Sequence, residues 1–355
     1  MVTGEKVGTS DFAVDTVATP RYAGYIMLDN YGSLYTGRDR VSFNVDDNSI
    51  SGHGDHLSVS GLATNGGGLQ NGRIGYALPI APNGLREELA YSQTEYQLGN
   101  TYAPLDATGT AKATDLTLTY PVRRIRAQTI EASLNLSHKN LVDKVQSTNT
   151  ITPKTSTSVT AGWSIRDERF VCGFDGLTRA SVDVTFGQLN ISEAAAKAAD
   201  SAGAQTQGSY SKLVAELSRV SLLPNSFTAT TTLKLQQALN NKNLDGSERM
   251  AVSGSGAVMA YPSGELIGSD AIFARAELSR PMPAAGRLQS NWLVFADWGN
   301  AKAANPQPTD VNRNISDAGF GWSLNYGGAL VHAYLAHRLN SHCEHPSETL
   351  AKTKL

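Results

Sequence analysis

The sequence predicts an all-β protein: a transmembrane antiparallel β-barrel of about 16 strands. Segments in which apolar and polar residues alternate recur along the whole chain. They are typically about ten residues long or longer, whereas strands of soluble sheets average ~5–6 residues and a tilted strand needs ~9–11 to cross a bilayer. Connections alternate between short and long. A soluble sandwich would also show the alternation, so length, number and even count together favour a closed barrel with a wet interior.

The composition agrees with a strand-rich protein. The chain has 355 residues, a net charge of −2 and 40% hydrophobic residues, and Gly, Ser, Thr, Asn and Tyr are abundant. The small net charge gives no global attraction to nucleic acid or to anionic lipid. The sequence contains no run of about 18 apolar residues, so it predicts no transmembrane helix. The first residues, "MVTGEKVGTSDFAVD", lack the basic and apolar regions of a signal peptide.

The predicted strands follow one another with one apolar and one polar face. In 226–237, the apolar face carries Phe227, Ala229, Thr231, Leu233 and Leu235. In 271–279, Ile272, Ala274, Ala276 and Leu278 alternate with Phe273, Arg275, Glu277 and Ser279. In 288–298, the alternation places Asp297 on the face opposite Trp292, Val294 and Trp298. The predicted segments are 21–32, 36–48, 56–65, 69–80, 84–98, 112–122, 124–138, 155–171, 176–189, 207–222, 225–238, 271–281, 288–298, 315–326, 328–339, and one that starts at 348.

The connections indicate which ends of the strands share a rim. Short turns are expected at 79–84 and 121–124, and long polar loops at 139–152, 190–206 and 299–314. Segment 193–204, "EAAAKAADSAGA", is typical of a short helix in one of the long loops. Short turns on one rim and long loops on the other are usual in outer-membrane barrels. We therefore expect residues 21–355 to form one barrel and residues 1–20 to be separate from it.

The stretch "AVMAYPSGELIGSDAIFARAEL", residues 257–278, begins as a loop and ends as a strand. Val258, Met259, Ala260 and Tyr261 are too apolar for an ordinary exposed turn. Pro262 and the glycines at 254, 256, 264 and 268 prevent a continuous helix or strand.

Several separated motifs resemble those of one known family, in the family's order. These are "YAGYIMLDNYGSLYTGRDRVSFNV" (22–45), "GHGDHLSVSGL" (52–62), "GLQNGRIGYALPIAPNGLR" (68–86), "TEYQLG" (94–99), "AYPSGELIGSDAIFARAEL" and "VFADWGNA" (294–301). The chain from about Gly8 onward resembles TpsB transporters, the outer-membrane pores of two-partner secretion, also called the ShlB/FhaC/HecB type, in the Omp85 superfamily.

The resemblance implies a sixteen-stranded barrel with a long loop folded into the lumen. The tip of that loop carries a motif written VRGY/F or VRAYP, here occupied by Val258, Met259, Ala260, Tyr261, Pro262, Gly264 and Glu265. The loop would then be apolar because it packs against the inside of the wall. The family also has two periplasmic POTRA domains and a plug helix before the barrel, so residues 1–20 are expected to be the remnant of a POTRA domain and linker. The ending "ETLAKTKL" implies an incomplete last strand.

One departure from the family concerns the motif's arginine, whose position is occupied by Met259. In the family this arginine reaches an acidic residue of the barrel wall, and Asp297 stands where that partner is expected. Arg275, predicted on the lumen face, is a candidate replacement. Two interpretations remain open: Met259 disables a lock between loop and wall, or it only fills a gap.

Other residues point to no cofactor, metal or enzyme chemistry. The cluster "HAYLAHRLNSHCEH" contains His332, His337, His342, Cys343 and His345, but His332 and His337 point to opposite faces of a strand, so a polar loop rim is favoured over a metal site. "SGSGAV" lacks the ending of a phosphate loop. Aromatic residues near strand ends suit interfacial girdles or ordinary cross-strand pairs: Tyr31, Tyr35, Tyr76, Tyr91, Tyr120, Trp163, Trp292 and Trp298.

The sequence thus predicts a monomeric pore in the outer membrane of a Gram-negative bacterium, surrounded by lipid, that secretes a large unfolded exoprotein and binds no nucleic acid. An Omp85-type outer-membrane assembly factor (insertase) is the alternative, and a soluble β-sandwich adhesin is a remoter one. Cys172 is expected near the short-turn rim and Cys343 in the last extracellular loop, too far apart for a disulfide.

Overall fold

A computed structural model describes residues 20–169, 171, 173–284, 286–307 and 312–340, with the backbone of three two-residue strands, 2–3, 10–11 and 353–354. Its main feature is an antiparallel sheet of 16 strands in the order β20-β19-β18-β17-β16-β13-β12-β11-β10-β9-β8-β7-β6-β5-β4-β3. The strands are β3 (Tyr22–Asp29), β4 (Arg40–Asn48), β5 (His56–Thr64), β6 (Leu69–Pro79), β7 (Arg86–Gln97), β8 (Ala107–Ile125), β9 (Gln128–Val145), β10 (Thr150–Asp167), β11 (Gly176–Ile191), β12 (Gly208–Leu222), β13 (Thr228–Ala238), β16 (Asp270–Pro281), β17 (Leu288–Lys302), β18 (Arg313–Tyr326), β19 (Ala329–Arg338) and β20 (Thr353–Lys354). Each strand of this sheet pairs with its neighbours in sequence along the meander.

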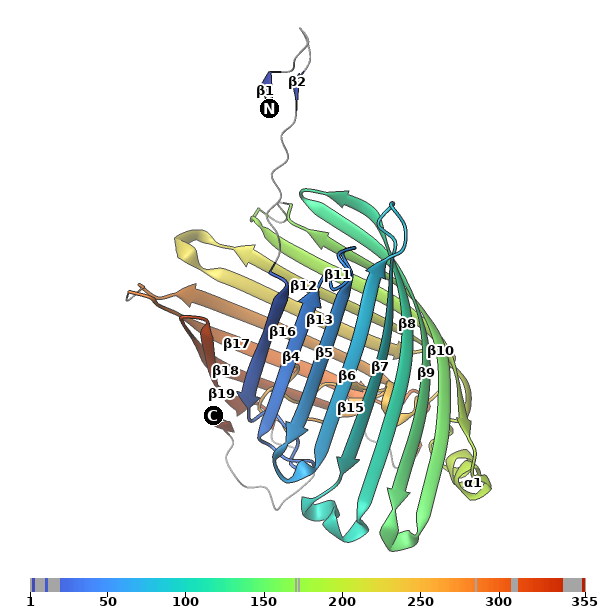
Figure 1. The fold of residues 1–355 in the computed structure, drawn as a ribbon. Coiled ribbons are helices and arrows are strands. Elements are labelled where there is room, and N and C mark those ends of the chain that lie inside the picture. Colours follow the sequence, from blue (N-terminus) through green and yellow to red (C-terminus); the bar gives the residue numbers. More distant parts are fainter. Residues whose placement is uncertain are drawn as a thin grey trace.

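The sheet curves around a central space, and its first long strand, β3, and last long strand, β19, are its two margins (Figure 1). In that view β3 is dark blue and β19 is dark red. Among the described residues no hydrogen-bonded ladder joins β3 to β19 or β20. The fold is therefore the predicted antiparallel barrel, with an unpaired seam between its first and last strands.

Alternation along the strands separates a lumen face from an outer face. In β17, Leu293, Phe295 and Asp297 are at most 7% exposed, whereas Val294 and Trp298 are each 42% exposed. The ladder registers carry this division around the sheet, because residues paired across neighbouring strands share a face. The faces predicted for 271–279 and 288–298 are confirmed.

Fifteen of the predicted strands correspond to β3–β13 and β16–β19, with ends shifted by a few residues. The expected long loop at 139–152 is wrong: β9 runs to Val145, β10 begins at Thr150, and a short 3-10 turn at Gln146–Thr148 joins them. Outside the apolar belt both faces of a strand contact water, so the alternation fades while the ladder continues. Of the segment expected from 348, only β20 lies within the described residues.

The remaining elements are short. Helix α1 (Ala194–Ala202) lies in the loop between β11 and β12, inside the predicted helix 193–204. The 3-10 turns are Asn65–Gly67, Asn100–Leu105, Gln146–Thr148, Pro224–Ser226 and Gly246–Glu248. Two-stranded ladders join β1 (Val2–Thr3) to β2 (Ser10–Asp11) and β14 (Met250–Ala251) to β15 (Ile267–Gly268). No helix in the described part of the chain is long and apolar enough to span a bilayer.

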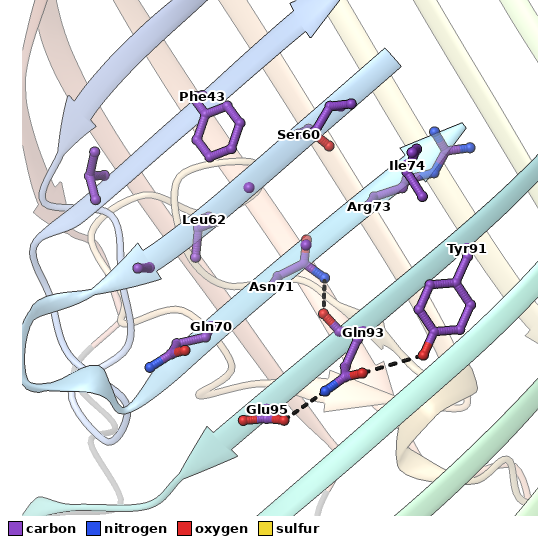
Figure 2. Close-up of a pocket in the computed structure, with 15 residues that line it drawn as sticks. Phe43, Ser60, Leu62, Gln70, Asn71, Arg73, Ile74, Tyr91, Gln93 and Glu95 are labelled. Carbon is purple, nitrogen blue, oxygen red and sulfur yellow. Dashed lines mark hydrogen bonds between the residues drawn. The ribbon is translucent and has the colours of Figure 1, made fainter. Parts of the chain in front are cut away.

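The outer face is apolar in its middle and polar toward the ends of some strands. A hollow of about 610 Å³ lies on this face, over β4–β7, and Figure 2 shows residues that line it. Phe43 and Ile74 lie along it, while Tyr91 Oη donates to Gln93 Oε1 (3.3 Å) and Gln93 Nε2 donates to Glu95 Oε1 (2.7 Å). This polar ladder at the far end of β7 marks the edge of the apolar belt on that side of the barrel.

Candidate functional site

The loop between β13 and β16, residues 239–269, is the predicted lumen loop. Its short β14–β15 ladder places the tip, 252–266, against the lumen faces of β16–β19. The largest buried cluster of the described residues forms there, from both loop and wall: Val252, Ala257, Val258, Ala260, Tyr261, Leu266, Ala271, Phe273, Leu293, Phe295, Ala301, Ile315 and Ala336. Burial of these side chains stabilises the folded-in position of the loop.

The apolar side chains of the tip motif pack against the barrel wall. Val258 and Tyr261 are 0% exposed and Pro262 is buried, while Met259 is partly buried against the same cluster. Gly264 is exposed, with a φ of 79° that favours glycine at this turn. The apolar character of the stretch thus follows from its contacts with the barrel wall.

Loop and wall approach each other closely at Gly299 of β17. A β-carbon added there would lie 3.1 Å from Val252 Cβ and 3.1 Å from Val258 Cγ2. The absence of a side chain at Gly299 therefore lets the loop pack tightly against this point of the strand.

Arg275 and Asp297 form an ion pair within the wall, beneath the loop tip. They are direct partners in the β16–β17 ladder. Arg275 Nε donates to Asp297 Oδ1 (2.7 Å) and Arg275 Nη2 donates to Asp297 Oδ2 (2.6 Å), and the Asp297 side chain is 0% exposed. Arg275 Nη2 also donates to the carbonyl oxygen of Ala257 in the loop (3.0 Å). A wall arginine thus holds both the wall carboxylate and the loop backbone.

Two further wall residues, Asp317 of β18 and Arg338 of β19, grip the backbone of Ala260. The amide of Ala260 donates to Asp317 Oδ2 (2.6 Å), and Arg338 Nε donates to the carbonyl oxygen of Ala260 (2.9 Å). The Arg338 guanidinium also lies 4.6 Å from the centroid of the Tyr261 ring. Asp317 pairs with Asp297 in the β17–β18 ladder, and in the described part of the chain its buried Oδ1 has no hydrogen-bond partner.

The loop tip also contacts both edges of the seam. Ser263 Oγ donates to the carbonyl oxygen of Tyr31, just after β3 (2.8 Å). Tyr261 Oη donates to the carbonyl oxygen of Asn340, just after β19 (3.2 Å). Glu265 pairs with Arg313 of β18 (2.7 Å).

A second set of charged contacts holds the root of the loop, on the opposite part of the wall. Glu248 pairs with Lys139 of β9 (2.6 Å) and with Lys212 of β12 (2.8 Å). Asp245 pairs with Lys154 of β10 (2.9 Å), which also pairs with Asp143 (3.0 Å). We call Lys139, Lys154 and Lys212 the lysine cluster.

The lysine cluster sets the protonation of the two loop carboxyls. Burial raises the pKa of Glu248, but Lys139 and Lys212 outweigh it and hold that pKa below its usual value. Burial likewise raises the pKa of Asp245, and the charge and hydrogen bond of Lys154 lower it further than burial raises it. Both groups are therefore carboxylates at neutral pH.

The sequence missed both the lysine cluster and the Asp317–Arg338 grip. The alternation along their strands places these residues on the lumen face. Their contacts with the loop, however, form only once the loop has folded into the lumen. In the predicted histidine cluster, His332 faces the lumen and His337 faces outward, as their ladder partners show. The other members lie outside the described residues, as does Cys172: His342, Cys343 and His345. Within the described residues no group of three or more His, Cys, Asp or Glu side chains is placed to hold a metal.

Comparisons with known proteins give the chain a family and structural relatives. The family described as "Haemolysin secretion/activation protein ShlB/FhaC/HecB" matches residues 8–324. The chain is also similar to the heme/hemopexin transporter protein HuxB of Haemophilus influenzae, with 25% identity over 303 residues, 84% of this chain and 52% of HuxB. The chain therefore spans about half the length of that relative.

Solved structures share the fold. CdiB from Escherichia coli superposes with a TM-score of 0.76 at 16% identity, over 92% of this chain and 60% of that one. CdiB from Acinetobacter baumannii gives 0.70 at 16% identity, over 92% and 57%. BamA from Haemophilus ducreyi gives 0.62 at 13% identity, over 90% and 66%.

Proposed function

Since the chain belongs to the ShlB/FhaC/HecB family of haemolysin secretion/activation proteins, we propose that it is the pore of a two-partner secretion system. In this proposal it passes one large unfolded exoprotein to the cell surface. It acts as a monomer surrounded by lipid, with no nucleic-acid partner. The chain is an outer-membrane protein of a Gram-negative bacterium.

The observation that carries the proposal is the loop folded into the lumen and held by the wall on two sides. In this proposal the tip motif Val258, Met259, Ala260, Tyr261, Pro262, Gly264 and Glu265 obstructs the lumen beside β16–β19. Val258, Ala260 and Tyr261 of this motif are buried against the inner face of those strands. Asp297 and Arg275 serve as the wall partners of this loop, with Arg275 in the role that the family gives to an arginine of the loop.

The lumen wall away from the loop tip suits a hydrated polypeptide. On β9–β13 a groove of about 300 Å³ is lined by hydroxyl and charged side chains, among them Ser181, Ser218 and Thr232. Hydroxyl groups offer an extended chain weak, exchangeable hydrogen bonds. This wall is the proposed path of the exoprotein.

The test is deletion of the gene for the full-length protein in its own organism. We expect a single large exoprotein to disappear from the medium and cell surface, and to return on complementation with the wild-type gene. A general fall in many outer-membrane proteins would instead support the assembly factor, since an insertase serves many clients. Monodisperse behaviour of the purified chain in detergent-free buffer would support the soluble adhesin.

A further inference from the structure

The lysine cluster lies on rigid strands, whereas the carboxylates that neutralise it belong to the loop. Lys139, Lys154 and Lys212 come from β9, β10 and β12, and their side chains are 25%, 16% and 15% exposed. Lys212 Nζ donates in addition to the carbonyl oxygen of Glu248 (3.0 Å). The loop thus covers the cluster with two carboxylates and a backbone carbonyl.

Charge in this part of the lumen balances only while the loop is in place. The wall contributes three ammonium groups and the carboxylate of Asp143, a net charge of two positives. The loop contributes the carboxylates of Asp245 and Glu248, which cancel it. Arg249 is also part of the loop, and its Nε donates to the loop's own Leu244 carbonyl (2.8 Å), so it leaves with the loop.

Asp143 does not neutralise the cluster by itself. It pairs with Lys154 (3.0 Å) and accepts from Tyr96 Oη (2.8 Å), which leaves Lys139 and Lys212 without a wall carboxylate among the contacts of the described residues. Partly buried ammonium groups without a counter-charge attract anions, and a carboxylate that can also accept hydrogen bonds is the best match for several lysines.

We propose that the lysine cluster is a carboxylate-binding site of the lumen, which the loop fills with Asp245 and Glu248 in the closed pore. When the loop leaves, the site takes acidic side chains of the polypeptide that is crossing. The loop is then an internal competitor of the exoprotein. This inference rests on the proposed function, and it specifies the acidic segments of the exoprotein as the partner of this site.

The site is tested with the full chain in planar lipid bilayers under a KCl gradient. In D245N/E248Q the loop loses its charges while the lysines remain, so we expect more frequent opening and a reversal potential shifted toward that of chloride. The matched control is D106N/E193Q, two carboxyls of other loops on the same rim, which should behave as wild type. Adding K139M, K154M and K212M to D245N/E248Q should keep the opening and abolish the chloride preference.

Binding is measured with a short polyglutamate peptide added to the open D245N/E248Q pore. We expect block of the current, with a half-blocking concentration raised at least about tenfold by the three lysine substitutions, which is about 1.4 kcal/mol of binding free energy. Polylysine of the same length should not block. Equal block by both peptides, or an unchanged reversal potential in D245N/E248Q, would overturn the inference.

Folding of each variant is checked by the shift of its gel mobility on heating. If the triple lysine variant does not fold, the single variants K139M, K154M and K212M carry the test, each with a smaller loss of chloride preference. Absence of any pore in wild type and every folded variant would count against the proposed function, whereas a pore without anion preference counts only against the carboxylate site.

Discussion

Arg275 and Asp297 face each other across the β16–β17 ladder and share two hydrogen bonds of 2.7 and 2.6 Å, while the same guanidinium holds the Ala257 carbonyl of the loop. Residue 259, where the resemblance to the family leads us to expect an arginine of the loop, is a methionine. Asp297 therefore has an arginine partner, but this arginine is Arg275 of the wall and not a residue of the loop. Arg275 contacts the loop only at the carbonyl oxygen of Ala257.

Arg275→Met should destabilise both barrel and loop. It leaves the Asp297 carboxylate buried without a cation, which costs about 3–5 kcal/mol when one partner of a buried pair is removed. We expect a lower midpoint of urea unfolding in micelles and faster proteolysis of the loop. Arg287→Met, at an exposed position before β17, is the control. Equal stability of both variants would show that the pair is dispensable.

Met259→Arg should tighten the loop by reaching Asp317, since Asp297 is already paired. Met259 precedes the Ala260 amide that binds Asp317 Oδ2, and Asp317 Oδ1 is buried without a partner among the described residues. A charge-assisted hydrogen bond contributes about 1.5–3 kcal/mol, so open probability in bilayers should fall about 10- to 100-fold. Asp317→Asn in the same background should remove most of the gain. An open probability that does not change would mean that Met259 only fills a gap.

Gly299→Val should push the loop away from β17. The added side chain would overlap Val252 and Val258, and overpacking of this kind costs about 1–3 kcal/mol. Gly72→Val is the matched control, because nothing lies within 4 Å of a β-carbon added at Gly72 on the outer wall. Protease accessibility of residues 239–269 reports the result: it should rise in the first variant and stay at the wild-type level in the second.

The contact of the loop root with the lysine cluster should survive mild acid. The pKa values of Asp245 and Glu248 are lowered from ordinary values of 3.8 and 4.5, so their stabilisation is complete above those values and is lost as pH falls below them. Open probability should stay constant from about pH 7 to about pH 5 and rise only below about pH 4. The D245N/E248Q variant, already uncharged, should not show that rise. An increase in wild type already near pH 6 would assign the response to other groups.

Much of the fold could be predicted because the alternation of apolar and polar residues can be recognised within each strand by itself. It placed Arg275 and Asp297 on the lumen face without any knowledge of their neighbours. The direct pairing of these two residues depends on the register between β16 and β17, which the intervening turn sets, so alternation within each strand leaves that pairing open. Glu248 and Lys139 lie 109 residues apart in the chain, and no local pattern joins them.

The end of β9 shows a different limit. Residues 139–152 are expected to form a long loop because the stretch is polar, yet the ladder between β9 and β10 continues to Val145. The hydropathy pattern of a strand depends on what surrounds its side chains, whereas strand pairing depends on backbone hydrogen bonds. Beyond the apolar belt the strands therefore stay paired although the hydropathy pattern no longer reveals them.

Ser263 is bonded next to β3, and Tyr261, two residues before it, is bonded next to β19, so one short piece of chain fastens both margins of the unpaired seam. Withdrawal of the loop from the lumen breaks both bonds in the same movement. Opening of the pore is then coupled to weakening of the barrel at its seam. When the pore is open, β3 and β19 are also freer to separate.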